Sequence, residues 1–254
     1  AVSGSLPVWA DGTVRPIIVG LDADMSAGTR PAGEALRRGI ILALNEINRA
    51  GGVLNRPMQL EIRDHRSNPA RGIDNMEDLA QIGDLVAVIG GAHTPTAIAT
   101  LDTVHRHGVP YLIPWAAGTK IVQNGRTPNF VFRVSAPDYM VGPYLIRAAA
   151  DRGFKRPGLL LWNTAWGRSN EDAMIGALEE HGLNAAGIEW FNTSESNMTD
   201  QIRRLIEKGA DVVMLVAGPR DGAVAVRSMA RMDAVERLPI ISHWGIALGN
   251  FYER

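Results

Sequence analysis

The sequence predicts an α/β protein made of two lobes, each a parallel sheet flanked by helices. Short apolar runs alternate with segments that carry apolar residues at helical spacing along nearly the whole chain. About nine strands are expected, which is more than one open sheet of typical size holds, so two sheets are predicted. A chain of 254 residues can bury the cores of two modest domains, which we place at residues 15–133 and 134–254.

Five runs in the first lobe have the length and the apolar or alternating pattern of strands. They are Arg15–Ala23, Pro57–His65, Leu85–Gly91, Val109–Pro114 and Asn129–Val134. Three segments between them have helical periodicity: Ala32–Gly52, Ala70–Ile82 and Thr94–Gly108. The first of these ends at two glycines, as a helix C-terminus commonly does.

The same alternation continues in the second lobe. Helices are predicted over Pro137–Arg152, Ser169–His181, Thr199–Lys208 and Asp221–Met232. Strands are predicted over Pro157–Asn163, Asn184–Phe191, Asp211–Gly218 and Leu238–Ser242. Strands that alternate with helices pair in parallel, so each lobe is expected to be a covered parallel sheet.

Composition excludes several classes of protein. The chain is 46% hydrophobic and 21% charged, with a formal net charge of -1, so nucleic acid is not an expected partner. No apolar run approaches the ~18 residues that span a bilayer. The first 16 residues lack the basic start and apolar stretch of a signal peptide, so the chain is either cytoplasmic or an exported protein whose signal has been removed.

Catalytic, cofactor and metal signatures are absent from the sequence. It has no glycine-rich motif for a dinucleotide or triphosphate, no nucleophile elbow and no cysteine. His105 and His107, two apart on a predicted helix, point to different faces and are expected to be solvated surface. We therefore expect no catalytic residue, no cofactor and no metal site.

Three tryptophans lie just past the ends of apolar runs: Trp115, Trp166 and Trp244. In open α/β sheets ligands bind beyond the carboxyl ends of the strands, so a cleft between two such lobes is the expected site. Thr94 and Pro95 have the pattern of a helix N-cap and first helical residue. The Thr94 hydroxyl and the free N–H groups there would either bind a carboxylate or serve only as a cap.

Several segments, in their order and spacing, resemble the leucine/isoleucine/valine-binding family of periplasmic solute-binding proteins. They include "NEINRAGG" followed by "RPMQLEIRDHRSNP", then "VAVIGGAHTPTAIA", "VPYLIPWAAGT" and "WNTAWGRSNEDAM". The resemblance covers Ile17 to about Gly249. It implies two Rossmann-like lobes that close by a hinge motion on a small molecule and deliver it to an ABC transporter permease. It also implies a periplasmic or extracytoplasmic location, with membrane contact only through the permease.

The family's ligand contacts can be carried onto matching positions. Thr94 matches the hydroxyl that binds the ligand carboxylate, and the loop of Ala116, Ala117, Gly118 and Thr119 matches the segment that completes that site. Asp138 matches an acidic position near the family's amine site, although capping a helix explains it equally well. Trp166 matches an aromatic residue that packs over the ligand.

The amine half of the site departs from the family pattern. Trp244 stands where amino-acid-binding members commonly have an acidic residue, and Arg220 falls near a position that is often aromatic. The resemblance therefore favours an aromatic or keto acid over an apolar amino acid, with Arg220 or His243 as a second anchor for an anion. The alternatives are an aromatic cage that holds an amine with Asp138, or tryptophans that are simply core, as expected for Trp162.

Family members usually continue past the point where this sequence stops. The resemblance thus implies that the C-terminal part of the family fold is missing from this chain or abridged. The same fold also serves as the ligand-binding sensor domain of receptors and regulators, which stays open as an alternative to transport.

Overall fold

The computed structural model describes residues 15–247, 249 and 251–253. The chain divides into two compact units. The first runs to Ala116 and includes Ile121–Ser135, and the second comprises Ala117–Lys120 and the chain from Ala136 onward. The short segment 117–120 therefore lies in the second unit, whereas the sequence analysis placed it in the first lobe.

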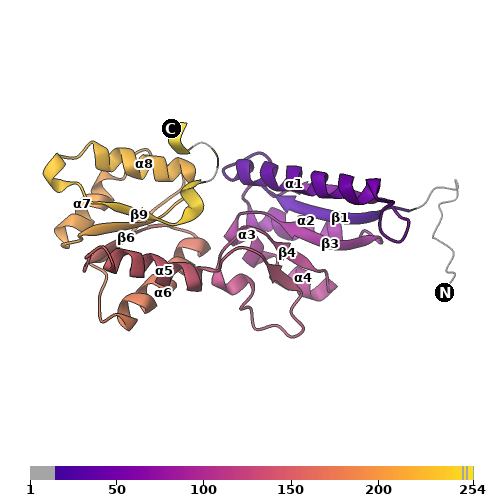
Figure 1. The fold of residues 1–254 in the computed structure, drawn as a ribbon, viewed down its shortest axis with the longest axis horizontal. Helices are drawn as coiled ribbons and strands as arrows, with labels where there is room; N and C mark the ends of the chain where they lie inside the picture. The colour runs from indigo at the N-terminus through magenta and orange to yellow at the C-terminus, as the bar shows by residue number, and fades with distance from the viewer. Residues whose placement is uncertain (1–14, 248, 250, 254) are drawn as a thin grey trace. The chain divides into compact units, whose positions relative to one another are not determined.

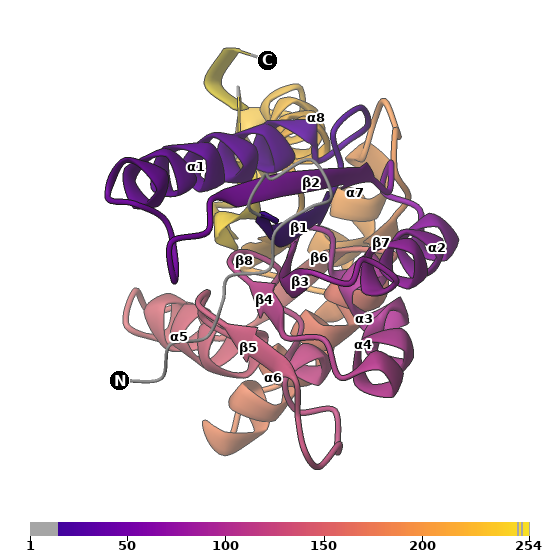
Figure 2. The same ribbon diagram turned by 90° about the vertical axis from the view of Figure 1, so that its right-hand side faces the viewer.

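The first unit is a five-stranded parallel sheet in the order β2-β1-β3-β4-β5. Its strands are β1 (Ile17–Ala23), β2 (Met58–Asp64), β3 (Leu85–Gly90), β4 (Tyr111–Ile113) and β5 (Val131–Arg133). Its helices are α1 (Arg30–Arg49), α2 (Pro69–Ala80), α3 (Thr94–Ala99) and α4 (Leu101–His107). Figure 2 shows α1 on one face of the sheet and α2, α3 and α4 on the other.

The helix predicted over Thr94–Gly108 is two helices, and its start was wrong by one residue. The N-cap of α3 is His93, so Thr94 is the first helical residue instead of the cap, and Pro95 follows it. The helix breaks at Thr100, whose hydroxyl donates to the Ala97 carbonyl at 3.0 Å. A β-branched residue that bonds back to the preceding turn competes with helix propagation, which accounts for a break there.

The second unit is a four-stranded parallel sheet in the order β7-β6-β8-β9. Its strands are β6 (Pro157–Trp162), β7 (Gly187–Phe191), β8 (Val212–Val216) and β9 (Ile240–Ser242). Its helices are α5 (Asp138–Ala150), α6 (Ala165–Glu180), α7 (Thr199–Glu207) and α8 (Pro219–Ala230). In Figure 1, α7 and α8 lie on one side of this sheet and α5 and α6 on the other. The predicted two sheets of an α/β fold are confirmed.

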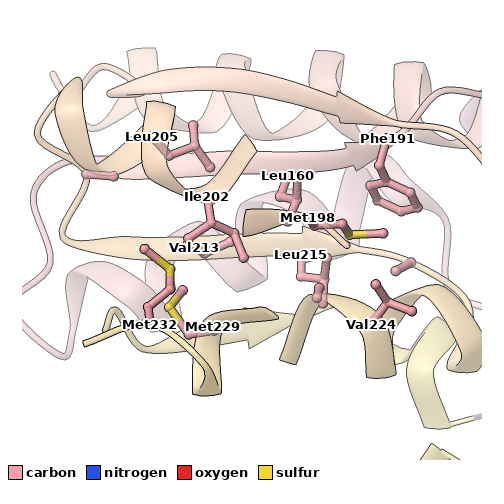
Figure 3. Packing of buried hydrophobic residues seen from close by; sticks show 13 residues of the cluster. Leu160, Phe191, Met198, Ile202, Leu205, Val213, Leu215, Val224, Met229 and Met232 are labelled. Atoms are coloured by element: carbon pink, nitrogen blue, oxygen red, sulfur yellow. The ribbon is translucent and has the colours of Figure 1, made fainter. Parts of the chain in front are cut away.

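Both faces of the second sheet are covered, which is why its strands read as continuous apolar runs. Leu159 and Leu161 pack with residues of α5 and α6, while Leu160 between them packs with residues of α7 and α8. Figure 3 shows the second of these clusters, with Phe191 and Leu215 among the labelled side chains. Successive strand residues point to opposite faces, so a strand buried on both sides cannot alternate with polar residues.

The start of α6 differs from the prediction in a way that matters for the site. The helix was predicted to begin at Ser169, but it begins at Ala165. Thr164 is the N-cap and accepts a hydrogen bond from the Gly167 N–H at 3.4 Å. Trp166 therefore lies in the first turn of α6, so the helical backbone sets the direction of its side chain.

No helix among the described residues is both long and apolar enough to cross a membrane. Within the same part of the chain, no group of three or more potential ligand side chains could hold a metal ion. Most of the N-terminal stretch in which no signal peptide was expected lies outside the described residues.

Candidate ligand-binding site

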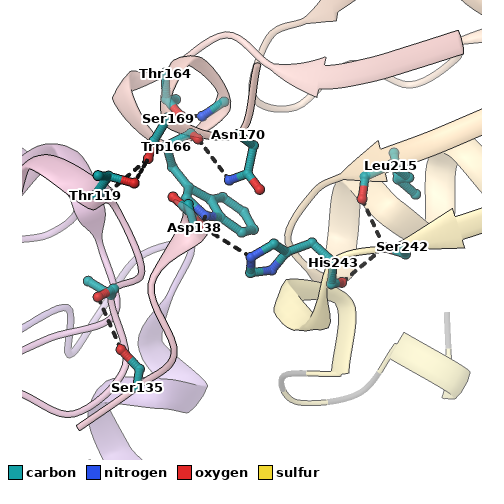
Figure 4. A network of polar contacts seen from close by, with 12 residues as sticks. Thr119, Ser135, Asp138, Thr164, Trp166, Ser169, Asn170, Leu215, Ser242 and His243 are labelled. Carbon is teal, nitrogen blue, oxygen red and sulfur yellow. Dashed lines mark hydrogen bonds and ion pairs between the residues drawn. The ribbon is translucent and has the colours of Figure 1, made fainter. Parts of the chain in front are cut away.

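Side chains from three segments meet at the carboxyl edge of the second sheet (Figure 4). Asp138 begins α5, Trp166 lies in the first turn of α6 after β6, and His243 follows the end of β9. Trp244 comes next and starts a short 3-10 helix, Trp244–Ala247. This edge is where ligands bind in open α/β sheets.

The carboxylate of Asp138 is fully buried and is bound by two ring N–H groups. Its Oδ1 atom accepts hydrogen bonds from Trp166 Nε1 at 3.3 Å and from His243 Nε2 at 3.2 Å. Its backbone N–H donates to the Ala117 carbonyl at 2.9 Å. The N-cap of α5 is Pro137, so the side chain of Asp138 serves the ring cluster instead of acting as an N-cap.

Four aromatic rings form a continuous series around this carboxylate. The His243 ring meets Trp166 edge-on, with centroids 4.8 Å apart and planes at 88°, and lies 4.1 Å from the Trp244 ring. Trp162 meets Trp166 edge-on at 6.4 Å and donates its Nε1–H to the Thr193 hydroxyl at 2.9 Å. Edge-to-face pairs of this kind add roughly 0.5–1.5 kcal/mol beyond burial, so the rings hold one another in fixed orientations.

Trp162 was expected to be core; it is half-buried, packs against the core cluster that contains Leu160 and Phe191, and also joins the ring series. Two of the three tryptophans singled out in the sequence, Trp166 and Trp244, share this cluster through His243. Trp115 is half-buried in the first unit, two residues after β4.

The cluster also holds buried polar atoms with unused hydrogen-bonding capacity. Asp138 Oδ2, His243 Nδ1 and Asn170 Oδ1 are buried and have no hydrogen-bond partner. Asn170 is held through its other amide atom, because Nδ2 donates to the Trp166 carbonyl at 3.0 Å. Buried polar atoms normally have a hydrogen-bond partner. Three such atoms without one, in a single network, indicate a polar functional site rather than ordinary core packing.

Close packing at a glycine lets the rings meet. A Cβ atom on Gly245 would lie 2.6 Å from the Ala217 carbonyl oxygen and would collide with the outer edge of the Trp166 indole. The residue after Trp244 therefore has to be glycine for β8, the Trp166 ring and the 3-10 helix to approach this closely.

The loop from Ala116 to Thr119 is tied into its surroundings by its own polar groups. The Ser169 hydroxyl accepts a hydrogen bond from the Thr119 N–H at 3.0 Å and donates to the Thr119 hydroxyl at 3.3 Å. Ala116, Ala117 and Gly118 are buried, and the Ala116 carbonyl accepts from the Ser135 hydroxyl. The sequence expected this loop to offer backbone and hydroxyl groups to a carboxylate, and the Thr119 hydroxyl is engaged by Ser169 here.

Arg220, in the first turn of α8, bonds to the loop that follows β7. Its Nη1 donates to the Ser194 hydroxyl at 3.1 Å. It lines an open hollow of about 380 Å³ together with Ser194, Glu195, Ser196, Val224 and Arg227. The two proposed second anchors thus have different partners: His243 contacts Trp166 and Trp244, and Arg220 bonds to Ser194 of the loop that follows β7.

Polar side chains also gather at the carboxyl edge of the first sheet, near Thr94, which is itself buried. Asp24 accepts from the backbone N–H groups of the turn that follows it and from the hydroxyls of Thr29 and Ser67. Burial opposes ionisation of Asp24, but these hydrogen bonds outweigh it and hold the pKa of its carboxyl below the usual value. Burial, together with the neighbouring His65, lowers the pKa of His93 to about 4, so that ring is neutral at pH 7.

Sequence reasoning missed Ser169 and Asn170. Both lie one turn after Trp166 in α6, at spacings of three and four residues, so they share its helical face. The signal was present in the sequence, but the helix was predicted to start too late for this face to be recognised.

Comparison with known proteins places the chain in a family. A family model described as periplasmic binding protein matches residues 16–245. A Leu/Ile/Val-binding protein homolog of Brucella melitensis is 22% identical over 249 residues, which cover 94% of this chain and 66% of that protein.

Two solved structures show the same fold. One is a branched-chain amino acid transporter substrate binding protein from Streptococcus pneumoniae in complex with isoleucine, with a TM-score of 0.77 and 18% identity. The other is a solute binding protein of an ABC transporter from R. palustris in complex with 4-hydroxybenzoate, with a TM-score of 0.78 and 19% identity. The matches cover 90% and 91% of this chain and 64% and 62% of those chains.

The chain therefore spans just under two-thirds of the length of these relatives. The resemblance drawn from the sequence segments is confirmed by the family model and by the Leu/Ile/Val-binding relatives. Because the matched region runs from residue 16 to residue 245, the chain belongs to the periplasmic binding protein family.

Proposed function

We propose that this chain is the solute-binding part of an extracytoplasmic receptor of an ABC transporter, which binds a small carboxylate with an apolar body and delivers it to a permease. Membership of the periplasmic binding protein family supports the binding role. The observation that carries the ligand class is the ring cluster of Trp166, His243 and Trp244 around the buried Asp138. Rigid indoles at a sheet edge offer apolar contact with little loss of conformational entropy on binding.

The ligand we favour is an aromatic or branched keto acid, with apolar amino acids second. Its carboxylate would be bound by Thr94 and the loop from Ala116 to Thr119, and its apolar body would lie against the indoles. Trp244 offers an ammonium group no carboxylate, and a buried unpaired ammonium costs several kcal/mol. Of the two solved relatives, one is in complex with isoleucine, an apolar amino acid, and the other with 4-hydroxybenzoate, an aromatic acid. These are the two ligand classes between which we choose.

A thermal-shift screen at one pH tests the proposal. One set contains benzoate, 4-hydroxybenzoate, phenylpyruvate and 4-methyl-2-oxopentanoate, and the other contains leucine, isoleucine and valine. A ligand that binds only the folded state raises the midpoint in proportion to the logarithm of its concentration over its Kd. We expect larger shifts with the first set. Shifts with the three amino acids and none with the aromatic and keto acids would show the ligand class to be wrong.

A further inference from the structure

We propose that His243 is the specificity-determining residue of this site: its imidazole holds the Asp138 carboxylate where the ammonium group of an amino acid would otherwise bind. The site thereby selects carboxylates that lack an amino group. This inference rests on the proposed function and gives that function its specificity.

The geometry of Asp138 is the first step. A carboxylate at the base of an aromatic cluster is ordinarily a cation site, because the ring faces and the carboxylate both attract positive charge. Here both donors on Oδ1 come from the protein itself, Trp166 Nε1 at 3.3 Å and His243 Nε2 at 3.2 Å. An imidazole that donates from Nε2 presents to Asp138 the kind of N–H group that an ammonium would present.

Burial is the second step. The side chains of Asp138 and His243 are both 0% exposed, and Asp138 Oδ2, although unpaired, is buried as well. An incoming ammonium therefore has to displace a covering side chain to reach the carboxylate, and the imidazole is the one already bonded to Oδ1. The imidazole is in turn held by ring contacts on two sides, with Trp166 and Trp244. Displacement would break these contacts and the hydrogen bond together.

The third step concerns two other acidic side chains of the second unit, Glu195 and Asp221, which already have partners of their own. Glu195 accepts from the Asn192 N–H and from Gln201 Nε2, both at 2.7 Å, and so serves its own loop. Asp221 is buried and accepts from the Ser194 N–H at 3.3 Å. Both carboxylates stand beside the loop after β7, whereas Asp138 is the one that contacts the indole of Trp166. Of these three carboxylates, Asp138 is the one bonded to the Trp166 indole, so an ammonium placed against that ring would have to reach Asp138, whose Oδ1 is bonded to His243 and whose Oδ2 is buried.

The experiment compares ligands that differ only in the ammonium group: L-phenylalanine with 3-phenylpropanoate, and L-leucine with 4-methylpentanoate. Calorimetry gives the Kd of each compound, and the quantity compared is the Kd of the amino acid divided by the Kd of its analogue without the amino group. In the wild-type chain we expect the analogue without the amino group to bind at least about tenfold more tightly, since no carboxylate is available there to pair with a buried ammonium. In His243→Ala, the freed Asp138 should lower this ratio by at least about tenfold.

Three further variants separate specificity from structural damage. His243→Gln keeps an N–H donor toward Asp138 and should retain the wild-type preference. The double variant His243→Ala with Asp138→Asn removes the charge and should restore that preference. His181→Ala, which replaces an exposed histidine at the end of α6, should leave the ratio unchanged. If His243→Ala shows no cooperative thermal transition, His243→Ser takes its place with the same expectation.

A probe without a carboxylate keeps this inference distinct from the proposed function. 2-Phenylethylamine should bind His243→Ala and not the wild-type chain. If neither carboxylate series binds the wild type, the proposed ligand class fails, and the amine still decides the role of His243. A folded His243→Ala protein with an unchanged ratio and no amine binding would overturn the inference, as would a wild-type chain that prefers the amino acids.

Discussion

Buried ionisable side chains in the first unit make its stability depend on pH in two opposing ways. Burial raises the pKa of Asp22 to about 7, and its Oδ2 has no partner, although Asn75 donates to Oδ1 at 2.7 Å. The folded state therefore holds the Asp22 proton that the unfolded chain releases near pH 4, and stability from this group falls as pH rises from about 4 to 7. For His93, with a pKa of about 4, stability is lost as pH falls from 6.5 toward 4.

Replacement of Asp22 by Asn should raise stability at alkaline pH. Above pH 7 the wild-type chain carries an ionised, incompletely paired carboxylate at this position, while the amide stays neutral. We expect Asp22→Asn to exceed the wild type by a few kcal/mol at most at pH 8, and to match it near pH 4. Urea unfolding at pH 4, 6 and 8 measures the difference. Asp74→Asn, at an exposed position of α2, is the control, and an Asp22→Asn protein less stable than wild type at pH 8 would refute the account.

Thr94 allows binding and stability to be separated at a single residue. Because the N-cap of α3 is His93, removal of the Thr94 hydroxyl deletes no cap. Thr94→Ala should weaken carboxylate binding by roughly 1–3 kcal/mol, the cost of a lost hydrogen bond to a charged group, with little change in Tm. Calorimetry with the ligand that gives the largest thermal shift measures the affinity. Unchanged affinity with a lower Tm would assign Thr94 a structural role only.

At the scale of elements, the ring cluster depends on how closely the 3-10 helix after β9 approaches α6. Gly245→Ala should force the Trp166 indole or the backbone to move, since its Cβ would also lie 2.6 Å from the Ala217 carbonyl oxygen. Overpacking of this kind costs roughly 1–3 kcal/mol, and the fluorescence emission of the half-buried indoles of Trp166 and Trp244 should shift. Gly176→Ala in α6, where nothing lies within 4 Å, should be neutral or stabilising. Equal effects of the two changes would contradict this packing.

The link between α6 and the loop from Ala116 to Thr119 makes a separate prediction. The Thr119 N–H donates to the Ser169 hydroxyl, so Ser169→Ala should speed amide hydrogen exchange at Thr119. Exchange at residues in the centre of α6 should stay as in the wild type, because the Ser169 hydroxyl bonds to Thr119 and not to the backbone of its own helix among the described contacts. Thr119 exchange that is unaffected by the change would mean that the amide is protected by something else.

For the whole molecule, the chain passes between the two units at residues 116–117, 120–121 and 135–136. If a solute is bound by groups from both units, it stabilises only the arrangement in which both contact it, and the population shifts toward that arrangement. We therefore expect small-angle scattering to show a smaller radius of gyration at saturating ligand. An unchanged radius with a ligand that raises Tm would argue against closure.

The sequence by itself determined the family and the alternation of strands and helices, although not every helix boundary. Continuous apolar runs such as Leu159–Leu161 require a strand covered on both faces, and the regular alternation with helices requires parallel sheets. The segments that resemble Leu/Ile/Val-binding proteins carried the family assignment without any structure. These features are local, because hydrophobic periodicity and glycines that end helices depend only on residues a few positions apart in the sequence.

Only the tertiary structure decided what the candidate residues touch. Asp138 and His243 are 105 residues apart in the chain, and no spacing rule joins them. The sequence left Asp138 open as a helix cap or an amine site, and gave His243 as an anchor for an anion. Folding places the imidazole on the carboxylate instead, because β9 ends beside the start of α5 at the same edge of the sheet. Long-range pairing of this kind follows from strand order, which the sequence pattern does not encode residue by residue.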